Sequence, residues 1–304
     1  MSQPAGGASP NTRPGIPTPP FPPVRCADVP TVTVAEQPGV DVSGRPRPTE
    51  DRVVVLPHAV IVLDGATALR PEARGGGWYA GELGRELADR LTERPGADLT
   101  ETLAEAIAAV AGAHHLVPGA APSSTVALLR WDDDVVDGLV LADSPVVVRT
   151  ASGVDVLTDD RLATLRRRGG GYRGRLARGG GFGADHVAAL RASARAVGEL
   201  RNTDGGFWVA EADPAAAHRG VRRSWPRAEV RAALVASDGV SCGVDDYQLF
   251  GWSEVFRLAG EHGPRAVLDA VRDAERADPD GRRWPRPKRH DDQALVLVDL
   301  TGPG

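Results

Sequence analysis

Three short apolar runs in this chain each border acidic residues, and this feature constrains the fold more than any other. Two runs end in the pairs Asp64-Gly65 and Asp238-Gly239, and the last run follows Asp291-Asp292. Short apolar runs that stop at a glycine are typical of buried strands, so these carboxylates are expected at strand ends beside a core. Like charges about 4 Å apart repel by about 4 kcal/mol per pair at an effective dielectric constant of about 20. The pattern therefore predicts a hard divalent cation between the acidic strand ends.

The length and charge favour a globular protein without a nucleic-acid or membrane partner. The chain has 304 residues, of which 41% are hydrophobic, and its net charge is -5, which disfavours a basic binding surface. No run approaches the roughly 20 apolar residues of a membrane span, and the N-terminus lacks a secretory-signal pattern. Cys26 and Cys242 are the two cysteines, so no structural disulfide is expected and we predict a cytoplasmic location.

The first 44 residues differ in composition from the rest of the chain. Pro, Gly, Ser and Thr dominate them, as in PAGGASPNTRPGIPTPPFPPV. Such a composition cannot bury enough apolar surface to offset the entropy lost on ordering. We therefore predict a disordered tail over residues 1–44 and one folded domain over residues 45–304.

Within that domain, blocks of strands alternate with blocks of helices. Apolar runs predict strands at 53–56, 59–63, 125–131, 135–141, 146–149 and 154–157. Leu83, Leu87 and Leu91 mark one helix, a capping-box pattern at Asp98 begins another, and further helices are expected at 186–200 and 264–276. The glycine triplets that begin at 75, 169 and 179 are expected to be loops, with 169–183 irregular. Closely spaced strands must be antiparallel, so we predict an α+β fold.

Six short motifs, taken in order, resemble those of the metal-dependent protein phosphatase 2C (PPM-type) family. They are TEDR at 49–52, LDG at 63–65, SST at 123–125, LADS at 141–144, SDG at 237–239 and HDD at 290–292. One motif alone would be weak evidence, because Asp-Gly is mostly a turn dipeptide. The resemblance covers nearly all of residues 45–304. It implies a four-layer α-β-β-α sandwich of two antiparallel sheets flanked by helices, with two Mn²⁺ or Mg²⁺ ions at one edge.

The resemblance also implies a set of metal ligands. Asp64 would bridge both ions, the Gly65 carbonyl would bind one of them, and Asp238 and Asp291 would bind the other. Asp143 would contribute to a third ion. Coordination by oxygen atoms alone suits Mn²⁺ or Mg²⁺ better than Zn²⁺, which prefers His and Cys.

Other residues of the motifs would act around these ligands. By the same resemblance, Glu50 and Asp51 would hold water molecules bound to the metals, and Thr125 would support the ligands from behind. A phosphate-binding arginine usually precedes the first acidic motif in the family. Arg45 and Arg47 both precede it here, and the sequence does not choose between them.

The implied enzyme is a protein serine/threonine phosphatase that uses Asp64, Asp238 and Asp291 as catalytic residues. Two metal ions can activate a bridging water for in-line attack on phosphorus. Phosphoprotein substrates, such as the targets of a Ser/Thr kinase, follow from the resemblance. Ala66 and Thr67 stand where some members have a histidine that serves as general acid. A catalytically weak regulatory module, or pseudophosphatase, is therefore the first alternative.

A second alternative is a serine hydrolase. The segment from Gly239 to Gly243 fits the Gly-x-Ser-x-Gly pattern of a nucleophile elbow around Ser241, and Asp280 and His290 follow in the required order. This hypothesis leaves the acidic residues of the other motifs unexplained.

Overall fold

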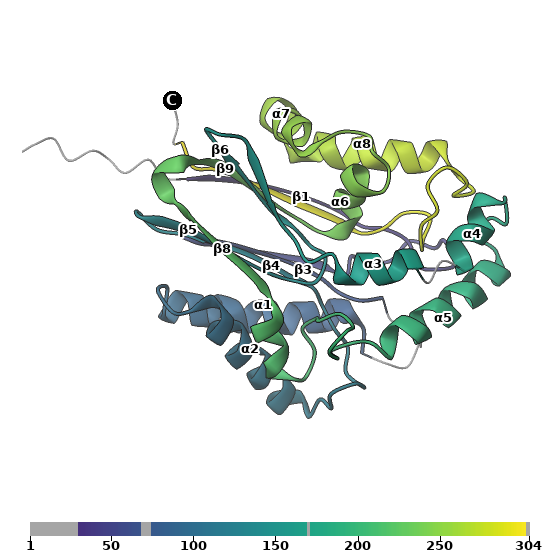
Figure 1. Ribbon diagram of the computed structural model, residues 1–304, viewed down its shortest axis with the longest axis horizontal. Helices are drawn as coiled ribbons and strands as arrows, with labels where there is room; N and C mark the ends of the chain where they lie inside the picture. The colour runs from purple at the N-terminus through teal and green to yellow at the C-terminus, as the bar shows by residue number, and fades with distance from the viewer. Residues whose placement is uncertain (1–29, 68–73, 169–170, 302–304) are drawn as a thin grey trace, which may run out of the picture.

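The computed structural model describes residues 30–67, 74–168 and 171–301. Two five-stranded sheets lie face to face, and helices cover the outer face of each (Figure 1). All strand pairs within the two sheets are antiparallel. The predicted α+β sandwich of four layers is confirmed.

Each sheet combines strands from distant parts of the chain. The first has the order β1 (Thr31–Gln37), β10 (Gln293–Asp299), β9 (Val230–Ala236), β6 (Val146–Thr150) and β7 (Val154–Leu157). The second has the order β2 (Asp51–Leu56), β3 (Ala59–Asp64), β4 (Val126–Trp131), β5 (Val135–Leu141) and β8 (Val221–Pro226).

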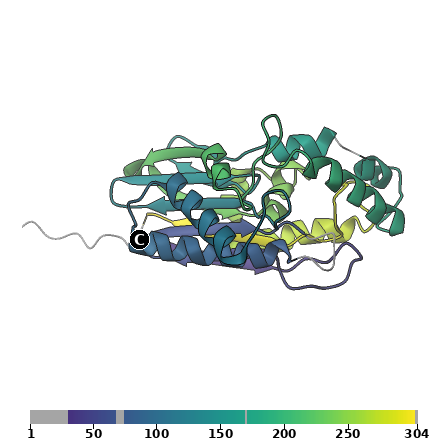
Figure 2. The same ribbon diagram turned by 90° about the horizontal axis from the view of Figure 1, so that it is seen from below.

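The helices form three groups. The second sheet is covered by α1 (Gly76–Glu93) and α2 (Leu99–His114), and the first by α6 (Asp238–Asp245), α7 (Trp252–His262) and α8 (Pro264–Ala277). Figure 2 shows α3 (Arg161–Arg168), α4 (Gly171–Ala177) and α5 (Ala184–Gly198) gathered at one end of the molecule. Two short 3₁₀ helices, η1 (Pro214–Arg219) and η2 (Arg227–Glu229), flank β8. No helix in the described ranges is long and apolar enough to cross a membrane.

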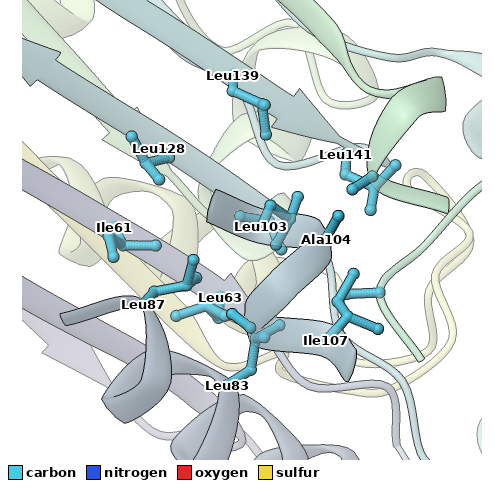
Figure 3. Close-up of a cluster of buried hydrophobic side chains, with 14 of the residues drawn as sticks. Ile61, Leu63, Leu83, Leu87, Leu103, Ala104, Ile107, Leu128, Leu139 and Leu141 are labelled. Carbon is cyan, nitrogen blue, oxygen red and sulfur yellow. The ribbon is translucent and has the colours of Figure 1, made fainter. Parts of the chain in front are cut away.

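The inner strand β3, second in its sheet, is apolar on both faces because both faces are covered. Val60 and Val62 belong to the core between the sheets. Ile61 and Leu63 belong to the core beneath the helices, where they pack with the leucine face of α1 and with residues of α2, β4 and β5 (Figure 3). Burial of both faces explains why this strand reads as a continuous apolar run.

Helix boundaries follow from local chemistry. The Asp98 carboxylate caps α2 by accepting hydrogen bonds from the backbone of Thr100, at 2.8 Å, and Glu101, at 3.1 Å. Pro264 occupies the start of α8, where its missing N–H is not needed. Both predicted helix starts are confirmed.

The predicted boundary at residue 44 is wrong for part of the segment. Residues 31–37 form β1, which pairs with β10 along its whole length, from Thr31 opposite Asp299 to Gln37 opposite Gln293. Ala35 is buried in the core under α7 and α8. The alternating pattern of this strand is short and directly follows the proline-rich stretch, so the composition of the whole segment did not indicate a strand. The predicted disorder of residues 1–29 lies outside the described residues.

The segment 169–183 was predicted to be irregular, and this is wrong for residues 171–177. They form α4, which buries Tyr172 and Leu176 against Leu190 of α5. Two apolar residues four positions apart among arginines are a weak helix signal, and the contact with α5 stabilises the helix. Residues 169–170 lie outside the described part of the chain.

Candidate metal centre

The acidic residues predicted at strand ends meet at one edge of the sandwich. Asp51, the first residue of β2, lies directly opposite Asp64, the last residue of β3. Asp238 begins α6, and Asp291 lies just before β10. The charges of Asp238, Asp51 and Asp291 all act on Asp64. The fold therefore brings these four carboxylates into one group, which we call the acidic cluster.

The backbone around Asp64 is fixed by the serine and threonine motif of the neighbouring strand. The Asp64 N–H donates to Thr125 Oγ1 at 3.1 Å, and the Thr125 N–H donates to the Asp64 carbonyl at 2.9 Å. Thr125 Oγ1 also lies 2.6 Å from Ser144 Oγ. Thr125 therefore holds the backbone of Asp64 from the neighbouring strand.

Glycines allow the first turn of α1 to approach this corner. A Cβ on Gly65 would lie 2.3 Å from the carbonyl carbon of Gly76, and a Cβ on Gly77 would lie 2.8 Å from the Glu50 Cα. Side chains at these positions would collide with backbone. The predicted loop at 75–77 is wrong, since Gly75 is the N-cap of α1 and the next two glycines begin the helix.

Burial and mutual repulsion disfavour the charged forms of the cluster. Asp51 is fully buried, and neither carboxylate oxygen has a well-formed hydrogen bond within the described residues. Burial raises the pKa of Asp51 well above its ordinary value, and the charges of Asp292, Asp291 and Asp238 raise it further. The Ser237 hydroxyl offsets only part of this rise. Such a group is costly unless a cation lies near it.

Asp64 and Asp238 show the same effect. Burial raises the pKa of Asp64 well above its ordinary value, with further increments from Asp238 and Asp51. Burial, Asp291 and Asp143 raise the pKa of Asp238 to about 6.

One internal cation comes from α3. Arg166 Nη1 lies 3.0 Å from Asp143 Oδ2 and 3.1 Å from Asp238 Oδ2. The other oxygen of Asp143 is buried without a hydrogen-bond partner among the residues described. Arg166 thus pairs with both Asp143 and Asp238, and Asp143 lies beside the acidic cluster.

Two further cations approach from the other side. Lys288 Nζ contacts Asp291 Oδ1 and lies 3.8 Å from Asp292 Oδ2. Arg47 forms ion pairs with Glu50 and Asp292. Although burial favours the neutral acid, Lys288 lowers the pKa of Asp291 below its ordinary value. The sequence analysis missed Lys288, although it is the chain's only lysine and lies three residues before Asp291.

The structure separates the two candidate phosphate-binding arginines. The Arg45 side chain is 82% exposed and pairs with Asp41 at 3.7 Å, outside the cluster. The Arg47 side chain is 15% exposed and lies against Glu50 and Asp292. Arg47 is therefore placed at the site, and Arg45 is not.

The acidic cluster opens into a cavity. Its volume is about 380 Å³, and its lining includes Asp143, Asp238 and Asp291 together with Arg166, Arg173 and Lys288. Acidic and basic side chains thus face the same space, which suits an anionic group held between positive side chains and a cation held between the acids.

The chemistry of the donors fits a hard divalent ion, although the side chains are engaged elsewhere. Carboxylate oxygens without partners at Asp51 and Asp143 are the kind of donor that Mg²⁺ and Mn²⁺ bind. Across the described ranges, no three His, Cys, Asp or Glu side chains are arranged as ligands of one metal ion. Lys288 and Arg166 contact the carboxylates that such an ion would need.

The structure does not assemble the serine-hydrolase triad. Ser241 lies within α6 and is 6% exposed. His290 Nδ1 lies 2.9 Å from Glu275 Oε2. No hydrogen bond in the described part of the chain joins Ser241, His290 and Asp280.

Comparison with solved structures gives the fold a family context. No protein-family model matches the sequence, and the comparison with curated proteins finds no match. The catalytic domain of the serine/threonine protein phosphatase PstP, in complex with 2 manganese ions, aligns over 89% of this chain and 98% of its own, with 14% identity and a TM-score of 0.53.

Two other phosphatases align in the same way. The PPM Ser-Thr phosphatase MsPP of Mycobacterium smegmatis, in complex with cacodylate, gives 16% identity and a TM-score of 0.52 over 89% of this chain and 98% of its own. Stp1 of Staphylococcus aureus gives 13% identity and a TM-score of 0.53 over 89% of this chain and 95% of its own. This chain has the fold of the PPM-type serine/threonine phosphatases.

Proposed function

We propose that this protein is a metal-dependent phosphatase that hydrolyses phosphoserine and phosphothreonine in proteins. The main observation behind the proposal is that Asp51 is fully buried, lies opposite Asp64, and has no well-formed hydrogen bond at either carboxylate oxygen in the described structure. A folded protein bears this repulsion where a bound cation offsets it. The fold shared with PPM-type phosphatases supports the phosphoprotein substrate class.

The proposed metal ligands are those of the acidic cluster and its neighbours. Asp64, the Gly65 carbonyl, Asp238 and Asp291 would hold two Mn²⁺ or Mg²⁺ ions, and Asp143 would contribute to a third. When bound, such ions lower the pKa of a water molecule and balance the charge on the phosphoryl oxygens. The manganese ions of PstP support this choice of metal.

The remaining roles belong to this chain's own side chains. Arg47 has the planar guanidinium geometry that binds two phosphate oxygens at once, and its present partners are Glu50 and Asp292. Thr125 holds the backbone of Asp64 in place. The cavity beside Asp238 and Asp291 would admit the phosphorylated side chain. A cytoplasmic location stays a prediction from the sequence.

A second candidate is a regulatory module that binds phosphoproteins with little turnover. The observation that favours it is the pairing of Lys288 and Arg166 with predicted metal ligands. Ala66 also lacks the proton-donating group that some PPM members have at this position.

Turnover of p-nitrophenyl phosphate with Mn²⁺ and with EDTA tests the proposal. We expect turnover with Mn²⁺, loss of turnover in EDTA, and loss in Asp238→Asn because a charged oxygen donor becomes neutral. Asp89→Asn is the matched control, since Asp89 is exposed on α1. Mn²⁺ binding without turnover would favour the regulatory module, and ester hydrolysis indifferent to EDTA would contradict the metal mechanism.

A further inference from the structure

Lys288 is the chain's only lysine and is buried at the acidic cluster. Its side chain is 6% exposed. All the other residues counted as Lys or Arg in the chain are arginines. The ammonium contacts Asp291 Oδ1, donates to Thr67 Oγ1 at 3.2 Å, and lies 3.8 Å from Asp292 Oδ2. A compact ammonium ion therefore lies between Asp291, a proposed metal ligand, and the neighbouring Asp292.

The loop that carries Lys288 is built around a separate buried ion pair. The Asp278 carboxylate accepts hydrogen bonds from the Trp284 N–H at 2.9 Å and from Arg286 Nη1 at 3.0 Å. Arg286 Nη2 donates to the carbonyls of Glu275, at 3.0 Å, and Asp278, at 2.8 Å. These bonds fix the loop independently of the acidic cluster. Lys288 is thus delivered to Asp291 by the fold.

The ammonium and a divalent ion compete for the same oxygen. A buried charge must be paired, and Lys288 is paired through Asp291, a proposed metal ligand. A second cation at Asp291 would repel the ammonium at close range. Arg166 also pairs with proposed ligands, but its side chain is 38% exposed and can move into solvent, whereas Lys288 is enclosed.

We propose that Lys288 is a built-in counter-cation of the metal site. Lys288 neutralises Asp291 and Asp292 when no divalent ion is bound, and it leaves Asp291 when an ion binds there. The inference rests on the metal site of the proposed function. Its consequences are a lower affinity for Mn²⁺ than the carboxylates alone would give, and a stable fold without metal.

Calorimetric titration of Mn²⁺ into three proteins tests the competition. Lys288→Met keeps an unbranched, flexible side chain that is slightly shorter, and removes its charge. Arg282→Met removes a positive charge from the same loop, where the exposed Arg282 side chain contacts no acid of the cluster in the described residues. Removing one competing unit charge is expected to tighten Mn²⁺ binding by on the order of tenfold or more in Lys288→Met, and Arg282→Met should bind as the unmodified protein does.

Unchanged or weaker Mn²⁺ binding in Lys288→Met would overturn the inference and leave the proposed phosphatase intact. No Mn²⁺ binding in any of the three proteins would overturn both, because there would be no ion for Lys288 to exclude. Binding by Lys288→Met alone would support the inference in its strongest form.

A second measurement uses the unmodified protein, in case Lys288→Met does not fold. Lysine labelled with ¹³C at Cε gives one side-chain signal, because the chain has one lysine. Mg²⁺ is titrated at constant pH and ionic strength, with its occupancy followed by calorimetry. We expect the Lys288 signal to shift in proportion to Mg²⁺ occupancy. Mg²⁺ binding without a change in this signal would show that the ammonium stays at Asp291, contrary to the inference.

Discussion

Asp51 and Asp64 are directly opposed residues of the antiparallel strands β2 and β3, and burial raises the pKa of both carboxyl groups well above the ordinary value. Like charges at opposed positions of a sheet destabilise it. Thr125 and the glycines of α1 hold the corner in place, so the two side chains cannot separate by moving the backbone. The site is therefore arranged around a repulsion that a cation would relieve.

Replacing Asp51 by Asn should stabilise the metal-free protein and weaken metal binding. Asn keeps the shape of the side chain and removes the charge that Asp292, Asp291 and Asp238 oppose. In EDTA at about pH 8, each kcal/mol gained corresponds to a rise of about 2–4 °C in melting temperature for a domain of this size. The measurement is thermal unfolding with and without Mn²⁺. Asp89→Asn serves as the exposed control, and a lower melting temperature for Asp51→Asn in EDTA would contradict the repulsion.

The stability conferred by Asp238→Asn should depend on pH in a defined direction. In the folded protein the Asp238 pKa is raised to about 6 from an ordinary value of 3.8, with burial the largest cause. The folded state therefore binds this proton more tightly than the unfolded chain, and the destabilisation by the charged form is full above about pH 6 and disappears towards about pH 4. In EDTA, Asp238→Asn should exceed the wild type by on the order of 2 kcal/mol at pH 7.5.

Urea unfolding at several pH values measures this difference. The gap between the two proteins should close as the pH falls through about 6, because the wild-type carboxyl then becomes neutral like the amide. Asn can still accept a hydrogen bond from Arg166, so the contact at that position is kept. A gap that is constant from pH 7.5 to pH 4.5 would show that the Asp238 pKa is not raised.

Removal of β1 should destabilise the domain. A chain that begins at Arg45 lacks the seven residues paired with β10, the buried Ala35, and the hydrogen bond from the Gly39 N–H to Asp292 Oδ1 at 2.8 Å. We expect its melting temperature to fall by more than about 5 °C, since several such losses add up to a few kcal/mol. A chain that begins at Pro30 keeps the strand and is the control. Equal melting temperatures for the two shortened chains would mean that β1 contributes nothing.

The leaving group should decide the rate of hydrolysis. p-Nitrophenolate leaves as a stable anion, whereas a serine alkoxide must be protonated, and general acid catalysis is worth about 10² to 10⁴-fold. Ala66 supplies no proton, and His290 is engaged with Glu275. We expect much faster turnover of the aryl ester than of a phosphoserine peptide, and no acidic limb near a pKa of about 6.5 in the kcat profile of the peptide.

Measurement of kcat against pH for both substrates checks this expectation. Comparable rates would show that another group donates the proton. The variant His290→Gln would then identify His290 as that donor if it slowed only the peptide reaction.

Strands with strong local patterns were predictable from the sequence, and those that depend on partners were not. The apolar run of β3 is buried on both faces, and its limits were predicted to within one residue. In contrast, β8 exposes most of its side chains and carries two arginines. It forms a strand because it pairs with the edge of β5 over six residue pairs. The formation of β1 likewise depends on its pairing with β10. Local sequence carries little of that information.

The acidic residues of the candidate site could be predicted from the sequence because each carboxylate borders a recognisable strand. The basic residues that pair with them could not be predicted in this way. Arg166 precedes Asp238 by 72 residues and reaches it only because α3 lies beside the start of α6. Arg47 and Arg45 are equivalent by sequence, and only the folded chain turns one towards Asp292 and the other into solvent.

The apolar runs of the sequence determined an α+β fold with acids at its strand ends, because these are local properties that any packing of those strands must satisfy. The two-sheet sandwich with the site at one edge was implied by the family resemblance of the six motifs. Only the tertiary structure decided which charges balance those acids. Lys288 meets Asp291 and Thr67 through a loop fixed by Asp278 and Arg286, and ion pairing over long sequence distances depends on where packed elements place their side chains. The balance between internal and metal cations is therefore a property of the folded protein.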